Sequence, residues 1–284
     1  MNQDKVKVKL GEVSQTLLGP LWGRAQLSRE HSSLFYDAKA VELVEKIDYD
    51  FSTSDVPFMG ILFTAALKDN VSLFSLGSLR AKQFDDKIRA YITEHPRASV
   101  ISLGAGLDTT FYRVDNGTIH WYDLDLPSVI AIRKQLLEEP ERTTYISKSL
   151  FNMSWCKDVE HTEDGVFMIA GGVLPYFEES QVKRFFSMLA DNFPGVEIVF
   201  DVTSKLSAIF MNLNVWRMEI EGVQVKWVVK DANEMAQWDT RIRVIEQFPH
   251  FRGIPRNPAW GEEIKIWMDF IDEIKILNIF HVSV

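Results

Sequence analysis

The chain has 284 residues, 46% hydrophobic and 25% charged, enough for one large α/β domain or two small ones, and we favour one domain with an insertion. Its formal net charge of −9 has the wrong sign for a protein that neutralises nucleic-acid phosphates, so no nucleic-acid partner is expected. A single cysteine, Cys156, excludes an internal disulfide framework, and with six scattered histidines the sequence predicts no metal site.

The N-terminal segment 1–23 contains lysines but lacks the long apolar stretch of a secretory signal. No uninterrupted apolar run approaches the ~18 residues that a membrane span needs. We therefore expect a cytoplasmic protein that makes no membrane contact.

Residues 1–95 are predicted to form a helical N-terminal cap. Alternating lysines and apolar residues over 5–10 are compatible with a short edge strand or with a disordered lead. A helical pattern follows, with its apolar positions between Ala38 and Ile47. Arg24, near the start of this region, is interpreted as a solvated or salt-bridged side chain.

Another helix is predicted over 74–91, with Arg80 close to its start. An arginine there is at the unfavourable end of the helix dipole, which indicates an anionic partner. A ligand carboxylate held by the guanidinium and an ion pair with Asp85 or Asp86 are equally compatible with the sequence.

Strands and helices alternate from residue 96 onward, which predicts a parallel sheet covered on both faces. The predicted strands are 99–103, 118–124, 143–148, 165–170 and 196–201, with a helix over 178–193 after the fourth. The last part adds helices over 206–221 and 235–239, strands over 241–248 and 275–284, and an irregular loop over 251–267. The two late strands suggest an antiparallel hairpin that completes the sheet.

The most informative stretch is Val100–Arg113, VISLGAGLDTTFYR, in which a short apolar run breaks at glycines. A buried strand that turns into a helix through Gly104, Ala105 and Gly106 lets a ligand lie directly on the backbone. The next strand ends in Asp123 and Asp125, where a carboxylate can accept both hydroxyls of a ribose. Together these features predict an adenosine site.

A nicotinamide-dependent dehydrogenase is one class of protein with such a site. The turn of this chain lacks the third glycine of the dinucleotide fingerprint, which argues against that class.

The strings LGAGLDTTFYR, YDLDLP and GGVLPYF, together with GPLWGRAQLS near the N-terminus, resemble the leucine carboxyl methyltransferase family. The similarity is to its polyketide (tetracenomycin-like) O-methyltransferase branch and spans nearly the whole chain. It implies a class I, Rossmann-like α/β fold that binds S-adenosylmethionine and methylates a carboxylate or a phenolic hydroxyl of a small molecule. The core would then span 96–284, with 205–240 as a helical lid.

The resemblance also implies roles for single residues. Arg80 matches the arginine that holds the methionine carboxylate of the cofactor, and Gly104, with Ala105 and Gly106, matches the turn that packs against it. Asp125 matches the carboxylate that binds the ribose, with Asp123 as the competing choice.

Two positions depart from the family pattern. Ser149-Leu150 stands where an Asp-Leu pair near the adenine is usual, and Gly171 stands where a glutamate or a similar polar residue is usual. Weaker cofactor binding, an altered pocket and lost activity are all compatible with these changes. A catalytically impaired protein that binds S-adenosylmethionine is therefore the alternative function.

An ionised carboxylate acceptor needs no catalytic base, whereas a phenol with a pKa near ~10 benefits from one. Tyr176, His31 and Tyr36 are candidates to line the acceptor pocket, although a structural role fits each of them better, and no catalytic base is assigned. Aromatic residues of the C-terminal part either roof a planar substrate or pack the insertion onto the sheet; they are Phe210, Trp216, Trp227, Trp238, Phe251, Trp260 and Trp267.

Overall fold

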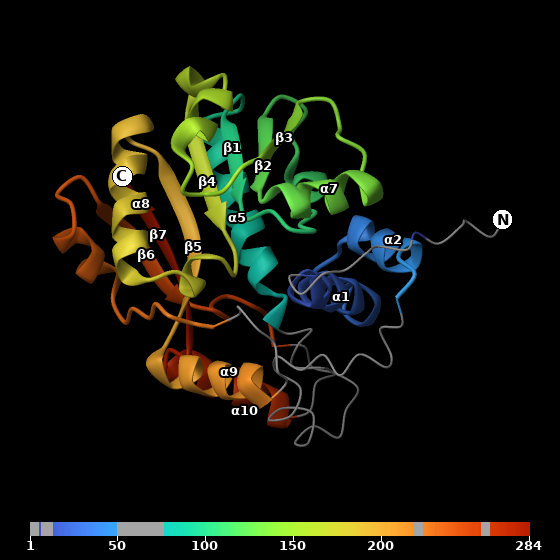
Figure 1. The fold of residues 1–284 in the computed structure, drawn as a ribbon. Coiled ribbons are helices and arrows are strands. Elements are labelled where there is room, and N and C mark those ends of the chain that lie inside the picture. The colour runs from blue at the N-terminus through green and yellow to red at the C-terminus, as the bar shows by residue number, and fades with distance from the viewer. Residues whose placement is uncertain (1–5, 7–13, 50–76, 218–223, 257–261) are drawn as a thin grey trace.

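The structure is a computed structural model that describes residues 6, 14–49, 77–217, 224–256 and 262–284 (Figure 1). The described part contains one seven-stranded sheet in the order β3-β2-β1-β4-β5-β7-β6. The strands are β1 Ser99–Leu103, β2 His120–Asp125, β3 Thr143–Ser147, β4 Val166–Ala170, β5 Glu197–Thr203, β6 Arg243–Pro249 and β7 Leu277–Ser283. All seven predicted strands are confirmed, with ends that differ by no more than two residues.

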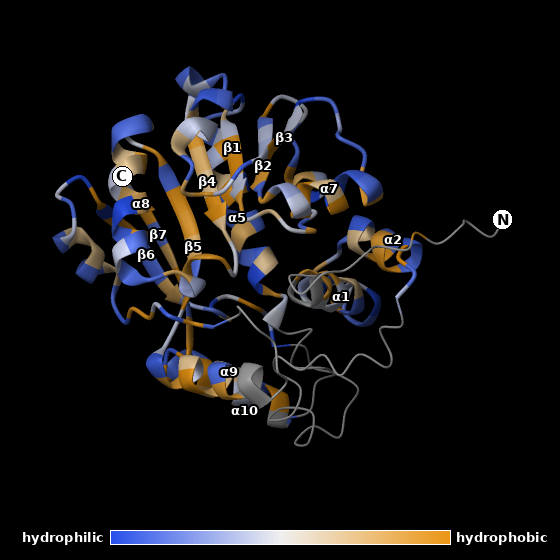
Figure 2. Ribbon diagram, in the orientation of Figure 1, coloured by the Kyte–Doolittle hydropathy of each residue, from blue (hydrophilic) through white to orange (hydrophobic). Residues whose placement is uncertain are grey.

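β1 to β5 are parallel to one another, and β7 is antiparallel to both β5 and β6. The predicted antiparallel pair at the end of the chain is therefore confirmed, although β7 inserts between β5 and β6. Figure 2 shows hydrophobic residues along β1, β4 and β5, as expected for strands that are covered on both faces.

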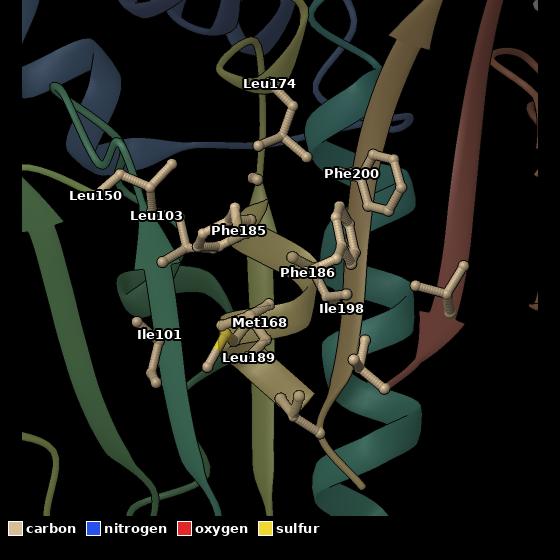
Figure 3. Packing of buried hydrophobic residues seen from close by; sticks show 14 of the residues in the cluster. Ile101, Leu103, Leu150, Met168, Leu174, Phe185, Phe186, Leu189, Ile198 and Phe200 are labelled. Atoms are coloured by element: carbon tan, nitrogen blue, oxygen red, sulfur yellow. The ribbon is translucent and has the colours of Figure 1, made fainter. Parts of the chain in front are cut away.

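Each face of the sheet is covered by a long helix. On one face α8, Glu179–Asn192, buries Phe185, Phe186 and Leu189 against side chains of β1, β4 and β5 (Figure 3). On the other face α5, Arg80–Glu94, buries Phe84 and Ile88. α5 therefore forms one of the two helical layers on the sheet, although it lies inside the range 1–95 that was predicted as a cap.

The other α-helices of the described residues are α1 Ser14–Glu30, α2 Ala38–Lys46, α6 Phe111–Val114, α7 Pro127–Leu136, α9 Lys205–Arg217 and α10 Glu262–Glu273. Residues 218–221 of the predicted helix over 206–221 lie outside the described residues, as do 74–76 of the helix before β1. Of the N-terminal segment 5–10 only Val6 is described, and it forms one parallel bridge with Ile47. In Figure 1, α1 and α2 lie on one side of the molecule, and α9 and α10 lie beyond the end of β5.

One predicted element is wrong. The stretch 251–267 was expected to be irregular, but α10 begins inside it at Glu262. The prolines and glycines of that stretch precede the helix, whose apolar residues Ile264, Met268 and Ile271 follow at helical spacing and are buried. The short helix predicted over 235–239 is a 3-10 helix at Ala232–Gln237.

None of the described helices is both long and apolar enough to cross a bilayer.

Candidate functional site

The carboxyl ends of five neighbouring parallel strands form one edge of the sheet. In the sheet order β3-β2-β1-β4-β5, this edge presents Ser149, Asp125, Gly104, Gly171 and Asp201 in that sequence. Neighbouring strands are about 4.8 Å apart, so the row is about 19 Å long. The fold therefore brings four predicted residues, together with Asp201, from separate parts of the chain to one edge, which is where open α/β sheets bind ligands.

The turn after β1 has the backbone conformation that its glycines were expected to permit. Gly104 has φ +64° and Gly106 has φ +49°, and the amides of Gly104 and Ala105 both donate to the Leu124 carbonyl, at 2.8 and 3.1 Å. A Cβ atom on Gly104 would lie 2.5 Å from Cγ2 of Val173. Both the conformation and the space require glycine at residue 104.

We expect Gly104→Ala to lower the free energy of unfolding more than Gly117→Ala does. Gly117 has φ +86°, and a Cβ atom there would meet nothing within 4 Å, so its replacement tests backbone strain alone, about 1 kcal/mol. Gly104→Ala adds the contact with Val173, which costs about 1–3 kcal/mol more. Urea denaturation of both variants measures the difference, and equal losses would contradict this account of the turn.

Asp125 ends β2 and is half-buried beside the glycine turn. One carboxylate oxygen accepts from the Gly106 amide and the other from the Leu126 amide, both at 2.7 Å. Burial raises the pKa of Asp125, and these two backbone donors partly offset that effect. Since a carboxylate offers about four acceptor positions, Asp125 retains capacity to bind hydroxyl donors.

Asp123, two residues earlier, has a different environment. Its side chain is 2% exposed, and it accepts from Arg133 Nη2 at 2.6 Å and from the Trp121 indole at 2.9 Å. Burial raises the pKa of Asp123, and the Arg133 charge opposes that shift. Asp123 is thus a buried structural ion-pair residue that fastens α7 to β2.

The segment after β3 contributes backbone and small side chains. Ser149 is half-buried, and its hydroxyl accepts from the Phe151 amide at 3.3 Å. Leu150 belongs to the core cluster beneath α8, and its carbonyl accepts from the Trp155 indole at 3.0 Å. Ser149 therefore offers a hydroxyl where the family resemblance implies a carboxylate.

Arg80 begins α5, where it was predicted, but its partner is neither Asp85 nor Asp86. Its Nη1 pairs with Oδ2 of Asp201, two residues before the end of β5. Asp201 uses its other oxygen to accept from the Gly172 amide at 2.6 Å. Asp201 is therefore a candidate site residue that the sequence analysis did not name, although it ended the predicted strand 196–201 and so gave a signal of the same kind as Asp125.

The turn after β4 passes close to Arg80. Gly172 has φ +70°, and a Cβ atom there would lie 3.3 Å from Arg80 Nη1. A Cβ on Gly171 would lie 2.9 Å from Cε2 of the buried Phe84 ring and 3.8 Å from Cζ of Arg80. A glutamate at residue 171 would thus require Phe84 to move.

Tyr176 follows this turn in the 3-10 helix Leu174–Tyr176. Burial, and next the negative charge of Asp201, raise the pKa of Tyr176 to about 12. The phenol therefore remains protonated near neutral pH and is a hydrogen-bond donor rather than a base. The other two candidates lie after α1: Tyr36 is 61% exposed, and burial lowers the pKa of the half-buried His31.

A buried charge network joins α1, the residue before α2, and α5 to the residues that follow the glycine turn. Arg113 donates to Oδ2 of Asp37 at 2.6 Å and to both oxygens of Asp85 at 2.8 and 2.9 Å. Asp37 also pairs with Arg24 at 3.1 Å and accepts from the Thr109 hydroxyl at 2.6 Å. The interpretation of Arg24 as a salt-bridged residue is confirmed, and the network gives the DTTFYR string a structural role.

The described aromatic residues of the C-terminal part mostly lie in the core. Trp227 and Trp238 pack against Phe200 and Phe186 beneath α8, and Phe251 is buried with α10. These contacts favour packing over a substrate roof for those three residues. The side chain of Trp216 and all of Trp260 lie outside the described part of the structure.

Within the described ranges, no cluster of three His, Cys, Asp or Glu residues is arranged to hold a metal ion.

The sequence matches one family of known proteins and two characterised relatives. Residues 18–190 match the family described as leucine carboxyl methyltransferase. The chain is 30% identical over 195 residues to the tetracenomycin polyketide synthesis O-methyltransferase TcmP of Streptomyces glaucescens, covering 68% of this chain and 67% of that protein. It is 27% identical over 250 residues to the S-adenosyl-L-methionine-dependent methyltransferase dpfgK of Gibberella zeae, covering 82% and 80% of the two chains.

Solved structures share the fold at low sequence identity. A DUF574-family protein from Streptomyces avermitilis superimposes with a TM-score of 0.55 at 10% identity, covering 92% of this chain and 96% of the other. A protein from Thermobifida fusca assigned as a methyltransferase gives a TM-score of 0.52 at 12% identity, covering 74% and 81%. At these identities the similarity concerns the arrangement of strands and helices.

Proposed function

The chain belongs to the leucine carboxyl methyltransferase family and is a class I S-adenosylmethionine-dependent methyltransferase. We propose that it methylates an oxygen atom of a polyketide-like small molecule. The observation that supports the acceptor class is the 30% identity to an O-methyltransferase of polyketide synthesis. We propose a carboxylate or a phenolic hydroxyl as the acceptor group.

The residues at the strand ends fit the cofactor. Asp125 offers free acceptor capacity beside the turn, which suits the two hydroxyls of a ribose. Gly104 is half-buried and has no side chain between its backbone and a ligand, whereas Gly106 is buried and holds Asp125 through its amide. Arg80 offers a cation for the carboxylate of the amino-acid end. We assign the adenine end to the side of Ser149 and Leu150, because β3 lies beyond β2 in the sheet.

The bound cofactor supplies a methyl group on a sulfonium, which is an activated donor. The protein's contribution is then to align the acceptor oxygen and to exclude water. Tyr176, whose pKa is raised to about 12, is suited to donate a hydrogen bond to an acceptor carbonyl or carboxylate and not to remove a proton. This assignment favours an acceptor that ionises by itself.

Methyl transfer is tested by incubating the protein with S-adenosylmethionine and matched aromatic acids and phenols. Mass spectrometry detects a methylated product, and mild alkaline hydrolysis distinguishes a methyl ester from a methyl ether. We expect a product with a polyketide-like aromatic acceptor. Binding of cofactor and acceptor without any product would contradict the proposal.

That last outcome would support the second candidate function, a catalytically impaired protein that binds S-adenosylmethionine. Ser149 and Gly171, which stand in place of two usual acidic residues, are the observations in its favour. Isothermal titration with S-adenosylmethionine and its demethylated product separates binding from turnover. The nicotinamide-dependent class is set aside, because the matched relatives are methyltransferases.

The acidic charge supports a small-molecule substrate in preference to nucleic acid. A reduced, cytoplasmic location is in keeping with Cys156, the one cysteine, which is free. Burial raises the pKa of its thiol to about 11, so the unreactive thiol form is favoured. The assignment of 205–240 as a lid also stays a prediction.

A further inference from the structure

We propose that Asp201 positions Arg80 and binds the ammonium group at the amino-acid end of the cofactor. This inference rests on the proposed cofactor and adds a binding residue from a different strand. It starts from the contacts of Asp201, which join α5, the turn after β4 and β5.

Asp201 lies on the face of β5 that is covered by α5. Side chains two residues apart on a strand share a face, and Val199 packs in the same cluster as Phe84 and Ile88 of α5. Asp201 is at the carboxyl end of this row, next to the turn after β4, because β4 and β5 are neighbours. Its side chain retains 15% exposure, so it is accessible at the edge of the sheet.

The pair of Arg80 and Asp201 has unused bonding capacity. Arg80 has five N–H donors, and among the described residues its one hydrogen bond is from Nη1 to Asp201. Asp201 accepts from Arg80 and from the Gly172 amide, which leaves about two of its four acceptor positions. A cation and an anion held side by side, each with free capacity, are complementary to the carboxylate and ammonium of an α-amino acid.

The space at Gly171 explains why the negative charge comes from β5. A side chain at residue 171 would meet the Phe84 ring at 2.9 Å, so the position next to Arg80 is filled by α5. A carboxylate reaching the same guanidinium from β5 avoids that contact. Gly171 thus leaves room for Phe84, and Asp201 supplies the negative charge beside Arg80.

The test compares three ligands by isothermal titration: S-adenosylhomocysteine, its analogue without the amino group, and 5′-methylthioadenosine, which lacks the amino-acid end. The parent is expected to bind S-adenosylhomocysteine at least about tenfold more tightly than the amino-free analogue, as for a charge-assisted hydrogen bond. Asp201→Asn is expected to abolish most of this preference and to leave the affinity for 5′-methylthioadenosine unchanged. Asp201→Glu is expected to restore part of the preference.

Glu197→Gln is the matched control. Glu197 lies on the same strand and face and also pairs with a basic side chain, His281 at 2.7 Å, but it is at the opposite end of β5. This variant is expected to bind all three ligands like the parent. If Asp201→Asn keeps the parent's preference for the amino group, or if the parent has none, Asp201 does not bind the ammonium.

The outcomes separate this inference from the proposed function. If the parent binds none of the three ligands, the proposed cofactor is wrong and the inference falls with it. If the parent binds S-adenosylhomocysteine and Asp201→Asn weakens all three ligands equally, the cofactor stands and the assigned role of Asp201 is wrong. The amino-group preference of the parent is measured without any variant, so a variant that fails to fold does not prevent a decision.

Discussion

Arg113→Met is expected to lower the free energy of unfolding by about 3–5 kcal/mol, because it leaves Asp37 and Asp85 buried without their main cation. The Arg113 side chain is 6% exposed and also donates to the hydroxyls of Thr109 and Thr110. Burial disfavours a charged Asp85 and raises its pKa, and the Arg113 charge opposes that shift. Urea denaturation followed by circular dichroism measures the loss.

Arg97→Met is the control for this prediction. Arg97 makes two hydrogen bonds to Asp164, at 3.1 and 2.9 Å, but the pair is exposed to solvent. Solvent-exposed pairs contribute little to stability, so the unfolding midpoint is expected to stay at the parent's value. If Arg113→Met unfolds at the same urea concentration as the control, the buried network does not stabilise the docking of the N-terminal helices.

Arg80→Met and Asp125→Asn are expected to weaken cofactor binding in two distinguishable ways. Each removes a charge-assisted contact, which corresponds to a loss of affinity for S-adenosylhomocysteine of about tenfold to a hundredfold. Arg80→Met should leave 5′-methylthioadenosine binding unchanged, because that ligand has no carboxylate. Asp125→Asn should weaken both ligands, because both contain the ribose. Isothermal titration measures the four affinities.

The neighbouring aspartate provides the control. Asp123→Asn removes a buried partner of Arg133, so it is expected to lower stability, with a smaller effect on affinity in the fraction that remains folded. If Asp123→Asn abolishes ribose binding and Asp125→Asn does not, the assignment of the two aspartates is reversed. If Arg80→Met weakens both ligands equally, Arg80 does not recognise the amino-acid end.

The network around Arg113 changes how the family-like string after the glycine turn is understood. Thr109 and Arg113 bind Asp37, Arg113 also binds Asp85, and the Thr110 hydroxyl accepts from Arg113. These contacts hold the N-terminal helices in place. Arg24 adds a hydrogen bond of 2.8 Å to the Leu107 carbonyl, within the same turn. The N-terminal helices are therefore bonded directly to the turn over 104–107. We expect a variant that releases these helices to bind the cofactor more weakly.

The sequence by itself determined the strands and the turn of the proposed site. Each depends on local information: an apolar run of the length of a strand, glycines that permit positive φ, and an acidic residue at a strand end. The helical pattern over 74–91 likewise placed Arg80 close to the start of a helix, and α5 begins at Arg80. The local pattern failed at α10, where Pro and Gly before the helix obscured its periodicity over Ile264, Met268 and Ile271.

The tertiary structure alone decided which charges meet. Arg80 and Asp201 are 121 positions apart, and they pair because α5 covers the face of the sheet on which Asp201 lies. Asp123 and Asp125 share a face of β2, so period-two alternation could not separate them. Arg133 on α7 engages the first and leaves the second at the open edge. Ion pairs follow the order of strands and helices in space, and that order is set by packing of the whole chain.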